Sequence, residues 1–348
     1  MKKYLLETAA RFLAPPLYYS QLHQLTRPAF SGLGHILMLH RVVPESKSLR
    51  IHNHKSLEIT PEYLEQLIMF FKKRNYHFCS LNDLDSITAN TNNLKKFVIF
   101  TLDDGYVDNY EFAWPVFKKH NIPFTIYVAT GLPDGTAILW WYLLEDLIVK
   151  IKQLDFNFES KAYKLANESI RQKESNFNLI RSLLTAAMDG NRADRIKEFF
   201  EQFEIPVYEI TNAMSLSWSQ IAELSNDPLV TIGAHTVNHY PLRVLSDSES
   251  RFEIIESGKR IESQIKKSVE HFCYPIGSYG PREVSILNES VYKTATTIQM
   301  ANLMAENLRH PFTLPRIMIN ALTTEKILTL QVNGLLPAIR NKFRKVVF

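Results

Sequence analysis

Short, unbroken apolar segments alternate with segments of helical periodicity along most of the chain. The apolar segments include HILMLH, FVIFTL and FTIYVATG, and the helical ones include YLEQLIMFFKKR and WPVFKKHN. Apolar runs of this length are typical of strands that are buried on both faces. Thr60 followed by Pro61 indicates the cap and first turn of a helix. The alternation predicts an α/β fold built on a parallel sheet or barrel.

The alternation stops between about Trp140 and Asn212. Three helical patterns follow one another there without a strand, in WWYLLEDLIVKIKQL, SNFNLIRSLLTAAM and ADRIKEFFEQF. We interpret this part as a helical insertion on the barrel. The predicted division is an N-terminal helix and connection (1–35), a first barrel part (36–139), the insertion (140–215), a second barrel part (216–325) and a basic amphipathic tail (326–348).

Composition and charge narrow the class of protein. The chain has 348 residues, 45% hydrophobic and 22% charged, which is the balance of an ordinary globular protein. The formal charge of +4 equals the charge of Arg340, Lys342, Arg344 and Lys345 in the tail, so the remainder is neutral. This distribution argues against nucleic acid as a partner.

The chain shows no pattern that predicts export or a membrane span. Glu7 and Arg11 interrupt the apolar run that a signal peptide needs, and no apolar stretch reaches about 20 residues. We therefore expect a cytoplasmic protein. The tail alternates apolar and basic residues with helical spacing after Pro337, which indicates either peripheral contact with the inner membrane surface or a solvated, frayed end.

Two histidines and two carboxylates are candidates for a metal site. His235 and His239 are four residues apart in AHTVNH, and Asp103 and Asp104 end a predicted strand. Two histidines and one carboxylate make an open zinc-type site, and a second carboxylate beside it can act as a base. Each pair alone is more often structural, but both pairs lie at predicted strand ends, where barrel enzymes place their chemistry.

Three motifs in this order, TLDDGYVDNY, AHTVNH and CYPIGSYG, resemble those of the polysaccharide deacetylases (carbohydrate esterase family four, nodulation-type deacetylase domain). The resemblance covers about residues 36–135 and 216–320. It implies a distorted (β/α) barrel of the polysaccharide-deacetylase type. It also implies a metal-dependent hydrolase that removes N-acetyl groups from an amino-sugar-containing glycan or glycan precursor.

The resemblance assigns roles to matching residues. Asp104, His235 and His239 match the metal ligands, and Asp103 matches the catalytic base. The backbone N–H of Ile276 matches the donor that stabilises the oxyanion, where a pre-aimed donor is needed.

Further residues are expected to border the substrate. Pro275 and Gly277 belong to the loop of the oxyanion donor, and Tyr106 either lines the substrate groove or covers the turn. Trp140 and Trp141 open the insertion and could stack on a sugar ring, but burial in a core is the favoured interpretation.

The chain departs from the family pattern at two places. Cys273 stands where many members carry an arginine that positions the base, and no histidine follows His310 to match their late acid. LMLHRV near the start resembles the permuted subgroup of biofilm-polysaccharide deacetylases, which implies that His40 is the general acid. The other interpretation is a hydrogen-bonded strand-end histidine. Arg316 in LPRIMI is our candidate to replace the missing arginine.

The cofactor and partners follow from the same resemblance. Zinc is the expected divalent metal, with Co, Ni or Mn as alternatives. The expected partner is a carbohydrate, free or lipid-linked. Two alternatives remain, namely hydrolysis of a formyl group or another amide, and a non-catalytic glycan-binding barrel. The intact TLDDG and HTVNH argue against the second alternative, because a pure binder needs no metal triad with a free base.

Overall fold

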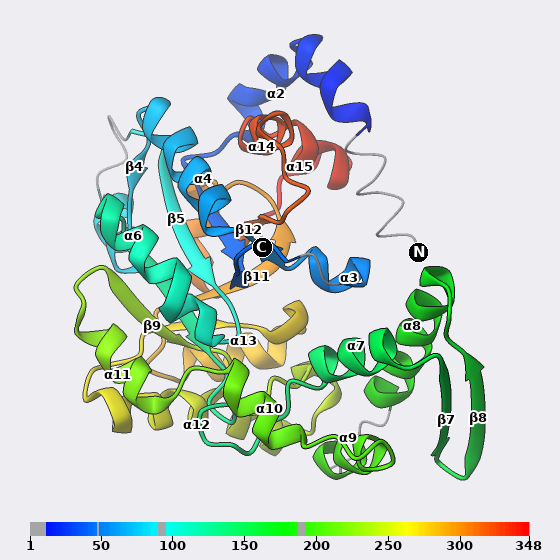
Figure 1. Cartoon of the computed structure of the whole chain (residues 1–348). Helices are drawn as coiled ribbons and strands as arrows, with labels where there is room; N and C mark the ends of the chain where they lie inside the picture. The colour runs from blue at the N-terminus through cyan, green and yellow to red at the C-terminus, as the bar shows by residue number, and fades with distance from the viewer. Residues whose placement is uncertain (1–11, 47–48, 90–94, 187–191, 348) are drawn as a thin grey trace.

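Seven parallel strands form a closed barrel surrounded by helices in the computed structural model, which describes residues 12–46, 49–89, 95–186 and 192–347 (Figure 1). In order around the barrel, the strands are β1 (Gly34–Leu39), β12 (Leu314–Met318), β11 (Thr294–Met300), β10 (His271–Cys273), β9 (Val230–Ala234), β6 (Phe124–Val128) and β5 (Phe97–Leu102). Pairing of β1 with β5, from Gly34 opposite Phe97 to Leu39 opposite Leu102, closes the ring. The predicted (β/α) barrel is confirmed.

Burial on both faces explains the unbroken apolar runs. All residues of β1, β5 and β6 are buried. Neighbouring residues belong to different cores: Ile36 packs with Ile99 and Cys273, whereas Leu37 packs with Phe100 in the larger core. This follows from the alternation of side chains across a strand, with one set inside the barrel and the other beneath the helices.

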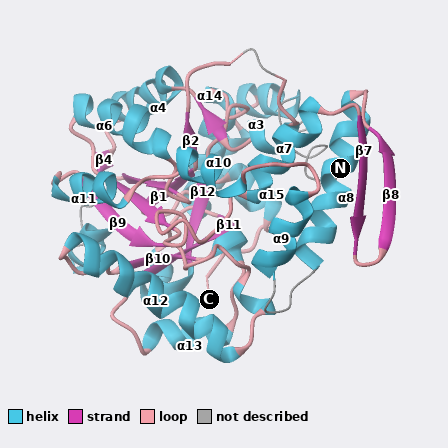
Figure 2. Cartoon of the chain, turned by 60° about the horizontal axis from the view of Figure 1, so that its bottom comes forward, coloured by secondary structure: helices cyan, strands magenta, loops and turns pink. Residues whose placement is uncertain are grey.

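Helices cover the outside of the barrel (Figure 2), and those over YLEQLIMFFKKR and WPVFKKHN lie where their periodicity predicts. Thr60 caps the first of them by accepting from the Tyr63 N–H at 3.1 Å, with Pro61 as the first helical residue. The covering helices are α4 (Pro61–Lys73), α5 (Leu84–Ala89), α6 (Trp114–His120), α11 (Trp218–Asn226), α12 (Asp247–Ile265) and α13 (Pro281–Asn288). A π-helical turn over Asn109–Ala113 precedes α6.

The segment after β6 contains helices and also a hairpin. Its helices are α7 (Trp140–Lys150), α8 (Ile170–Ala186), α9 (Arg192–Glu201) and α10 (Val207–Met214), which share a core separate from that of the barrel. The expectation of no strand here is wrong, because β7 (Gln153–Phe158) and β8 (Lys161–Ala166) form an antiparallel hairpin (Figure 1). QLDFNF buries every second residue, which is strand periodicity, but its first two residues also continue the helical pattern of WWYLLEDLIVKIKQL.

Helices from both ends of the chain lie together at the amino ends of the barrel strands (Figure 1). They are the helical residues 12–19, α2 (Leu22–Phe30), α14 (Glu325–Val332) and α15 (Leu335–Arg340). Leu335 and Ala338 are buried, so residues 335–340 are not a frayed end.

The short elements are β2 (Arg41–Val42), α3 (His52–Lys55), β3 (Glu58–Ile59) and β4 (His77–Phe78). Within the described ranges, no helix has the length and apolar character needed to cross a bilayer.

Candidate metal and catalytic site

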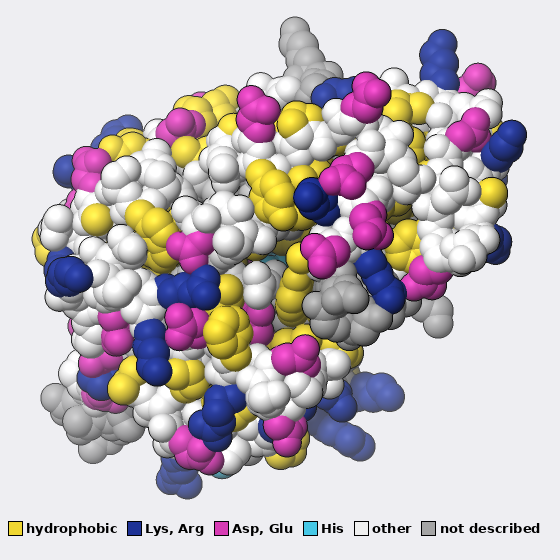
Figure 3. Space-filling view, turned by 90° about the horizontal axis from the view of Figure 1, so that it is seen from below, with side chains coloured by type: hydrophobic (Ala, Val, Ile, Leu, Met, Phe, Trp, Pro, Cys, Tyr) yellow, Lys and Arg dark blue, Asp and Glu magenta, His cyan; other side chains and the backbone are white. Residues whose placement is uncertain are grey.

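The predicted site residues converge at the carboxyl ends of the barrel strands. His40 follows β1, Asp103 and Asp104 follow β5, and His235 and His239 follow β9. Figure 3 shows the molecule from below, where hydrophobic side chains border a hollow near the centre of the face. The fold thus brings together residues that are up to about 200 positions apart in the sequence, as expected for a barrel enzyme.

Asp104 and the two histidines form a compact group of metal-ligating atoms. Oδ1 of Asp104 lies 3.1 Å from Nε2 of His239 and 3.3 Å from Nε2 of His235, and the three ligand atoms lie within 4.8 Å of one another. Nδ1 of His235 donates to the carbonyl of Cys273 at 2.7 Å, which leaves Nε2 as the free nitrogen. Burial raises the pKa of Asp104, but the imidazoles of His239 and His235 outweigh it and hold the pKa well below its usual value. Two imidazoles and an ionised carboxylate fit a zinc-type ion.

A non-helical turn brings the two histidines to one point. Thr236 (φ 67°) and His239 (φ 57°) both have left-handed backbones, and the His239 N–H donates to Thr236 Oγ1. Glu253 on α12 accepts from the Val237 and Asn238 backbone N–H groups, both at 2.8 Å, and from the Asn238 amide at 2.6 Å. Three hydrogen bonds to one buried carboxylate offset the cost of the unusual backbone.

Sequence reasoning missed Glu253. Helix α12 carries four other acidic residues, and no local signal separates the one that faces the histidine turn. Only its burial and its three donors identify it.

Asp103 is held by Arg316, which reaches it from β12. Nη1 and Nη2 of the guanidinium contact the two carboxylate oxygens at 2.6 and 2.7 Å. The same guanidinium donates to the Thr297 carbonyl, to Thr101 Oγ1 and to Cys273 Sγ at 2.9, 3.0 and 3.1 Å. Burial raises the pKa of Asp103, but Arg316 outweighs it and lowers that pKa below its usual value. Asp103 is therefore a fixed, ionised carboxylate.

A second group of possible ligands consists of Asp103, His235 and Cys273. In this group both Asp103 oxygens already bind Arg316, and the His235 Nδ1 already donates to a backbone carbonyl. The group around Asp104 is therefore the better metal site. Cys273 is fully buried, as expected of a packing residue, and its sulfur also accepts from Arg316.

His40 lies beside both carboxylates. Burial lowers its pKa, whereas the charges of Asp103 and Asp104 raise it, with a lowered pKa as the net result. Asn109 donates to the His40 carbonyl at 2.9 Å and so fixes the backbone at this point. Among the described residues, the buried Nδ1 of His40 has no hydrogen-bond partner. This does not support the interpretation of His40 as a hydrogen-bonded strand-end histidine.

The loop after β10 carries Pro275, Ile276 and Gly277. Ile276 is 48% exposed and has a left-handed backbone (φ 57°). A left-handed conformation costs an isoleucine about 1 kcal/mol or more. Gly277 (φ 67°) packs so tightly that a Cβ there would lie 2.3 Å from Ile298 Cγ1. The loop is therefore held in one unusual conformation, and the use of the Ile276 N–H as an oxyanion donor stays a prediction.

Trp141, the second residue of α7, lies next to His239, one of the predicted metal ligands. Its ring centroid is 4.9 Å from that of His239, its indole N–H donates to Tyr106 Oη at 3.1 Å, and it is only partly buried. Tyr106 is fully buried, so Trp141 rather than Tyr106 presents the more exposed ring beside His239. Trp140 packs on the core of the insertion. The sequence does not show which of the two tryptophans faces the site.

The profile of the polysaccharide deacetylase family matches residues 90–295, more than half of the chain. No curated protein matches. Among solved structures, the Streptococcus pyogenes deacetylase PplD is 19% identical with a TM-score of 0.57, over 86% of this chain and 97% of that one.

Two further structures are similar over most of their length. IcaB from Ammonifex degensii is 17% identical with a TM-score of 0.54, over 88% of this chain and 98% of that one. A de-N-acetylase from Aggregatibacter actinomycetemcomitans is 14% identical with a TM-score of 0.52, over 86% and 99%. At these identities the likeness establishes the shared fold.

Proposed function

Because the chain belongs to the polysaccharide deacetylase family and is therefore a hydrolase of non-peptide carbon–nitrogen bonds, we propose that it removes N-acetyl groups from an amino-sugar-containing glycan with the help of a divalent metal. The observation that carries the proposal is that two neighbouring carboxylates are bound by different partners. Asp104 faces His235 and His239, while its neighbour Asp103 is paired with Arg316. Such a division separates a metal ligand from a general base.

Each residue has one task in this proposal. A metal held by Asp104, His235 and His239 supplies Lewis-acid activation of water and of the amide carbonyl. Asp103 takes the proton of the attacking water, and the Ile276 N–H donates to the developing oxyanion.

The amide bond then breaks with a proton given to the leaving nitrogen. His40 supplies this proton from its imidazolium form, which the charges of Asp103 and Asp104 favour, and the proton that Asp103 took from water restores it, so that the products are acetate and a free amine. Arg316 is a positioning residue, because it orients Asp103 and keeps it ionised without contacting substrate.

The metal and the substrate are specified further by chemistry. A set of two imidazoles and one carboxylate favours zinc, and Co, Ni or Mn suit the same donors. We propose that the substrate is a carbohydrate chain or its precursor. At the inner face of the membrane this substrate would be linked to a lipid. The basic residues at the end of the chain and the apolar residues near its beginning support such a peripheral, cytoplasmic location.

Metal content and product identity test the function together. Purified chain is analysed for bound metal beside a His235→Ala/His239→Ala variant, and both are assayed on N-acetylglucosamine oligomers. We expect about one equivalent of divalent metal and release of acetate, with both lost in the variant. Formate from an N-formyl sugar without acetate from the N-acetyl one would identify the alternative amide. Absence of metal after reconstitution with zinc or cobalt would overturn the mechanism.

A further inference from the structure

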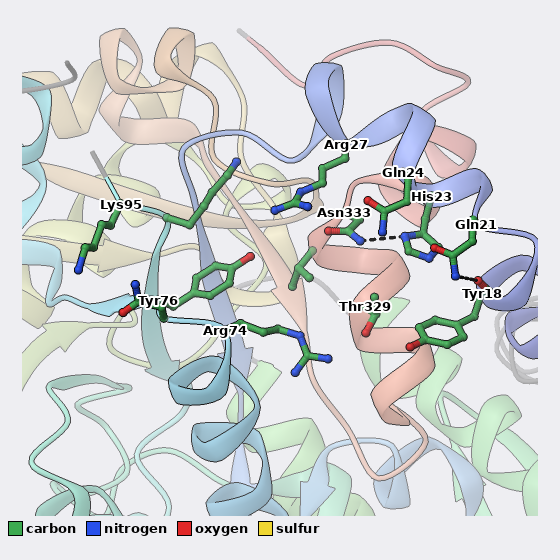
Figure 4. Close-up of a pocket in the computed structure, with 13 residues that line it drawn as sticks. Tyr18, Gln21, His23, Gln24, Arg27, Arg74, Tyr76, Lys95, Thr329 and Asn333 are labelled. Atoms are coloured by element: carbon green, nitrogen blue, oxygen red, sulfur yellow. Dashed lines mark hydrogen bonds between the residues drawn. The ribbon is translucent and has the colours of Figure 1, made fainter. Parts of the chain in front are cut away.

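A basic pocket lies at the amino ends of the barrel strands, opposite the catalytic face. It has a volume of about 460 Å³ and is formed by α2, the end of α4, the segments before β4 and β5, and α14. Figure 4 shows Arg27 and Arg74 on opposite sides of the pocket, with the ring of Tyr76 on a third side. The pocket therefore has no part in binding the scissile group.

The positive charge of this pocket is largely uncompensated. Arg27, Arg74, Lys95 and Lys96 line it, and no Asp or Glu does. Arg74 contacts the exposed carboxylate of Glu325 at 3.1 Å. Among the described residues, the Arg27 and Lys95 side chains have no hydrogen-bond or ion-pair partner.

Lys96 is held by neutral groups only. Its ammonium donates to Ser31 Oγ at 2.9 Å and to the Gly32 carbonyl. Burial and then the charge of Arg27 lower the pKa of Lys96 to about 8. A group of cations without a counter-charge is a site that an anion stabilises.

A buried hydrogen-bond donor also lines the pocket. The Asn333 amide nitrogen lies 2.8 Å from His23 Nδ1, and because an amide nitrogen only donates, Nδ1 is the acceptor. The proton of the neutral ring is then on Nε2, which is buried and has no partner among the described residues. An unpaired buried donor in a natural protein needs an explanation, and an oxygen-rich anion provides an acceptor for it.

Apolar side chains surround this end of the molecule. Of the sixteen large hydrophobic residues that are exposed in the described chain, seven lie in residues 12–25 and 339–343. Leu22 and Leu25 share one side of α2, at positions other than those of His23 and Arg27, which line the pocket. Exposed apolar groups beside a basic pocket are the combination that binds an anionic bilayer surface.

We propose that this pocket binds the phosphate of an anionic lipid headgroup while the exposed side chains of α2 and residues 12–19 enter the bilayer surface. The exposed leucines favour a lipid over a soluble phosphate ester. The inference rests on the membrane contact of the proposed function and is independent of the deacetylation chemistry. It places the membrane at the end of the barrel away from the metal site.

Vesicle co-sedimentation of the metal-loaded full chain tests the proposal. We expect binding to phosphatidylcholine vesicles that contain phosphatidic acid, and little binding to phosphatidylcholine alone. Arg27→Gln should weaken the binding about fivefold, and Arg27→Gln with Lys95→Gln by a further similar factor. The matched control is Arg171→Gln, which removes an exposed arginine of α8 and should bind like the unaltered chain.

Two further measurements identify the source of the phosphate. Leu22→Ser with Leu25→Ser should lose vesicle binding but keep the thermal stabilisation that inorganic phosphate gives. Stabilisation by phosphate without vesicle binding would overturn the lipid assignment, and equal vesicle binding by Arg27→Gln and Arg171→Gln would overturn the pocket. Acetate release from soluble oligomers, measured on the same preparations, should be unchanged, so failure of the deacetylase function is detected separately.

Discussion

Arg316 contacts both carboxylate oxygens of Asp103, from a strand that is separated from β5 by β1. According to the family resemblance, many members carry an arginine at the position where this chain has Cys273. Cys273 Sγ lies 3.1 Å from Arg316 Nη2. The guanidinium of Arg316 therefore lies beside the Cys273 side chain, although it comes from a different strand. A positive charge therefore lies beside Asp103, the proposed base, although it comes from another position in the sequence.

Replacing Arg316 should reduce turnover without releasing the metal. Arg316→Met leaves Asp103 buried without its counter-charge, so we expect kcat to fall about 100-fold or more and the free energy of unfolding to fall by about 3–5 kcal/mol. Kinetics, metal analysis and chemical denaturation measure the three quantities.

A second substitution distinguishes positioning from general destabilisation. Adding Cys273→Arg to Arg316→Met restores a guanidinium at the position that is usual in the family and should recover part of kcat. Turnover of Arg316→Met within about twofold of the unaltered enzyme, under roughly 0.5 kcal/mol of barrier, contradicts the assignment.

Removing the proposed base should separate chemistry from metal binding. Asp103→Asn keeps the shape of the side chain but cannot accept the proton of water, so we expect at least about 100-fold lower kcat with one equivalent of metal retained. Near-normal turnover by this variant would refute the role of Asp103.

The turn that carries the histidines should depend on Glu253. In Glu253→Gln one carboxylate oxygen becomes an NH₂ group that faces another donor, either the Asn238 amide or the backbone N–H groups. We expect about tenfold weaker metal binding, measured by competition with a chelator. Glu256→Gln, on the same helix and paired with Arg260, is the control and should bind metal normally.

Trp141 should affect substrate use more than stability. Trp141→Ala removes the ring beside His239, and we expect kcat/KM on oligomers to fall about tenfold. Trp141→Phe keeps a ring and should lie between. Trp114→Phe also loses an indole hydrogen bond, to Asp227 on the outside of the barrel, and should leave kcat/KM unchanged. Equal effects of the two Phe variants would exclude a specific contribution of Trp141.

Acid should destabilise the barrel through buried histidines. Burial lowers the pKa of His271 to about 4, whereas in the unfolded chain it is about 6.5. Between these values the unfolded chain binds the extra proton, so the free energy of unfolding decreases as the pH falls through this window and is unaffected above it. In metal-free protein, His271→Gln should reduce the pH dependence by at most about 1.4 kcal/mol per pH unit.

The parts of the structure that depend on local patterns could be predicted. Strands buried on both faces are continuous apolar runs, and Thr60 with Pro61 marks a helix start, so the pattern predicts a parallel sheet or barrel, and the family resemblance implies the barrel. The aspartates and histidines are candidates because they end predicted strands and match the family motifs, and the structure brings Asp104, His235 and His239 together. The β7–β8 hairpin was missed because its alternating pattern is short and directly follows a helix.

The remaining site residues depend on contacts between distant segments. Trp141 differs from Trp140 only in the direction of its side chain on α7, and that direction is set by packing of the insertion. Glu253 is significant because α12 lies beside the histidine turn. Neither relationship has a signature within a single sequence.

Strand β12 is the last strand in the described part of the chain, and it supplies both the closure of the barrel and Arg316. A nascent chain that ends before β12 has every proposed metal ligand, but its Asp103 lacks a counter-charge in an open sheet. Closure of the barrel and the fixing of Asp103, the proposed base, therefore depend on the same strand. An abortive translation product that lacks this strand would be inactive even if it retained metal.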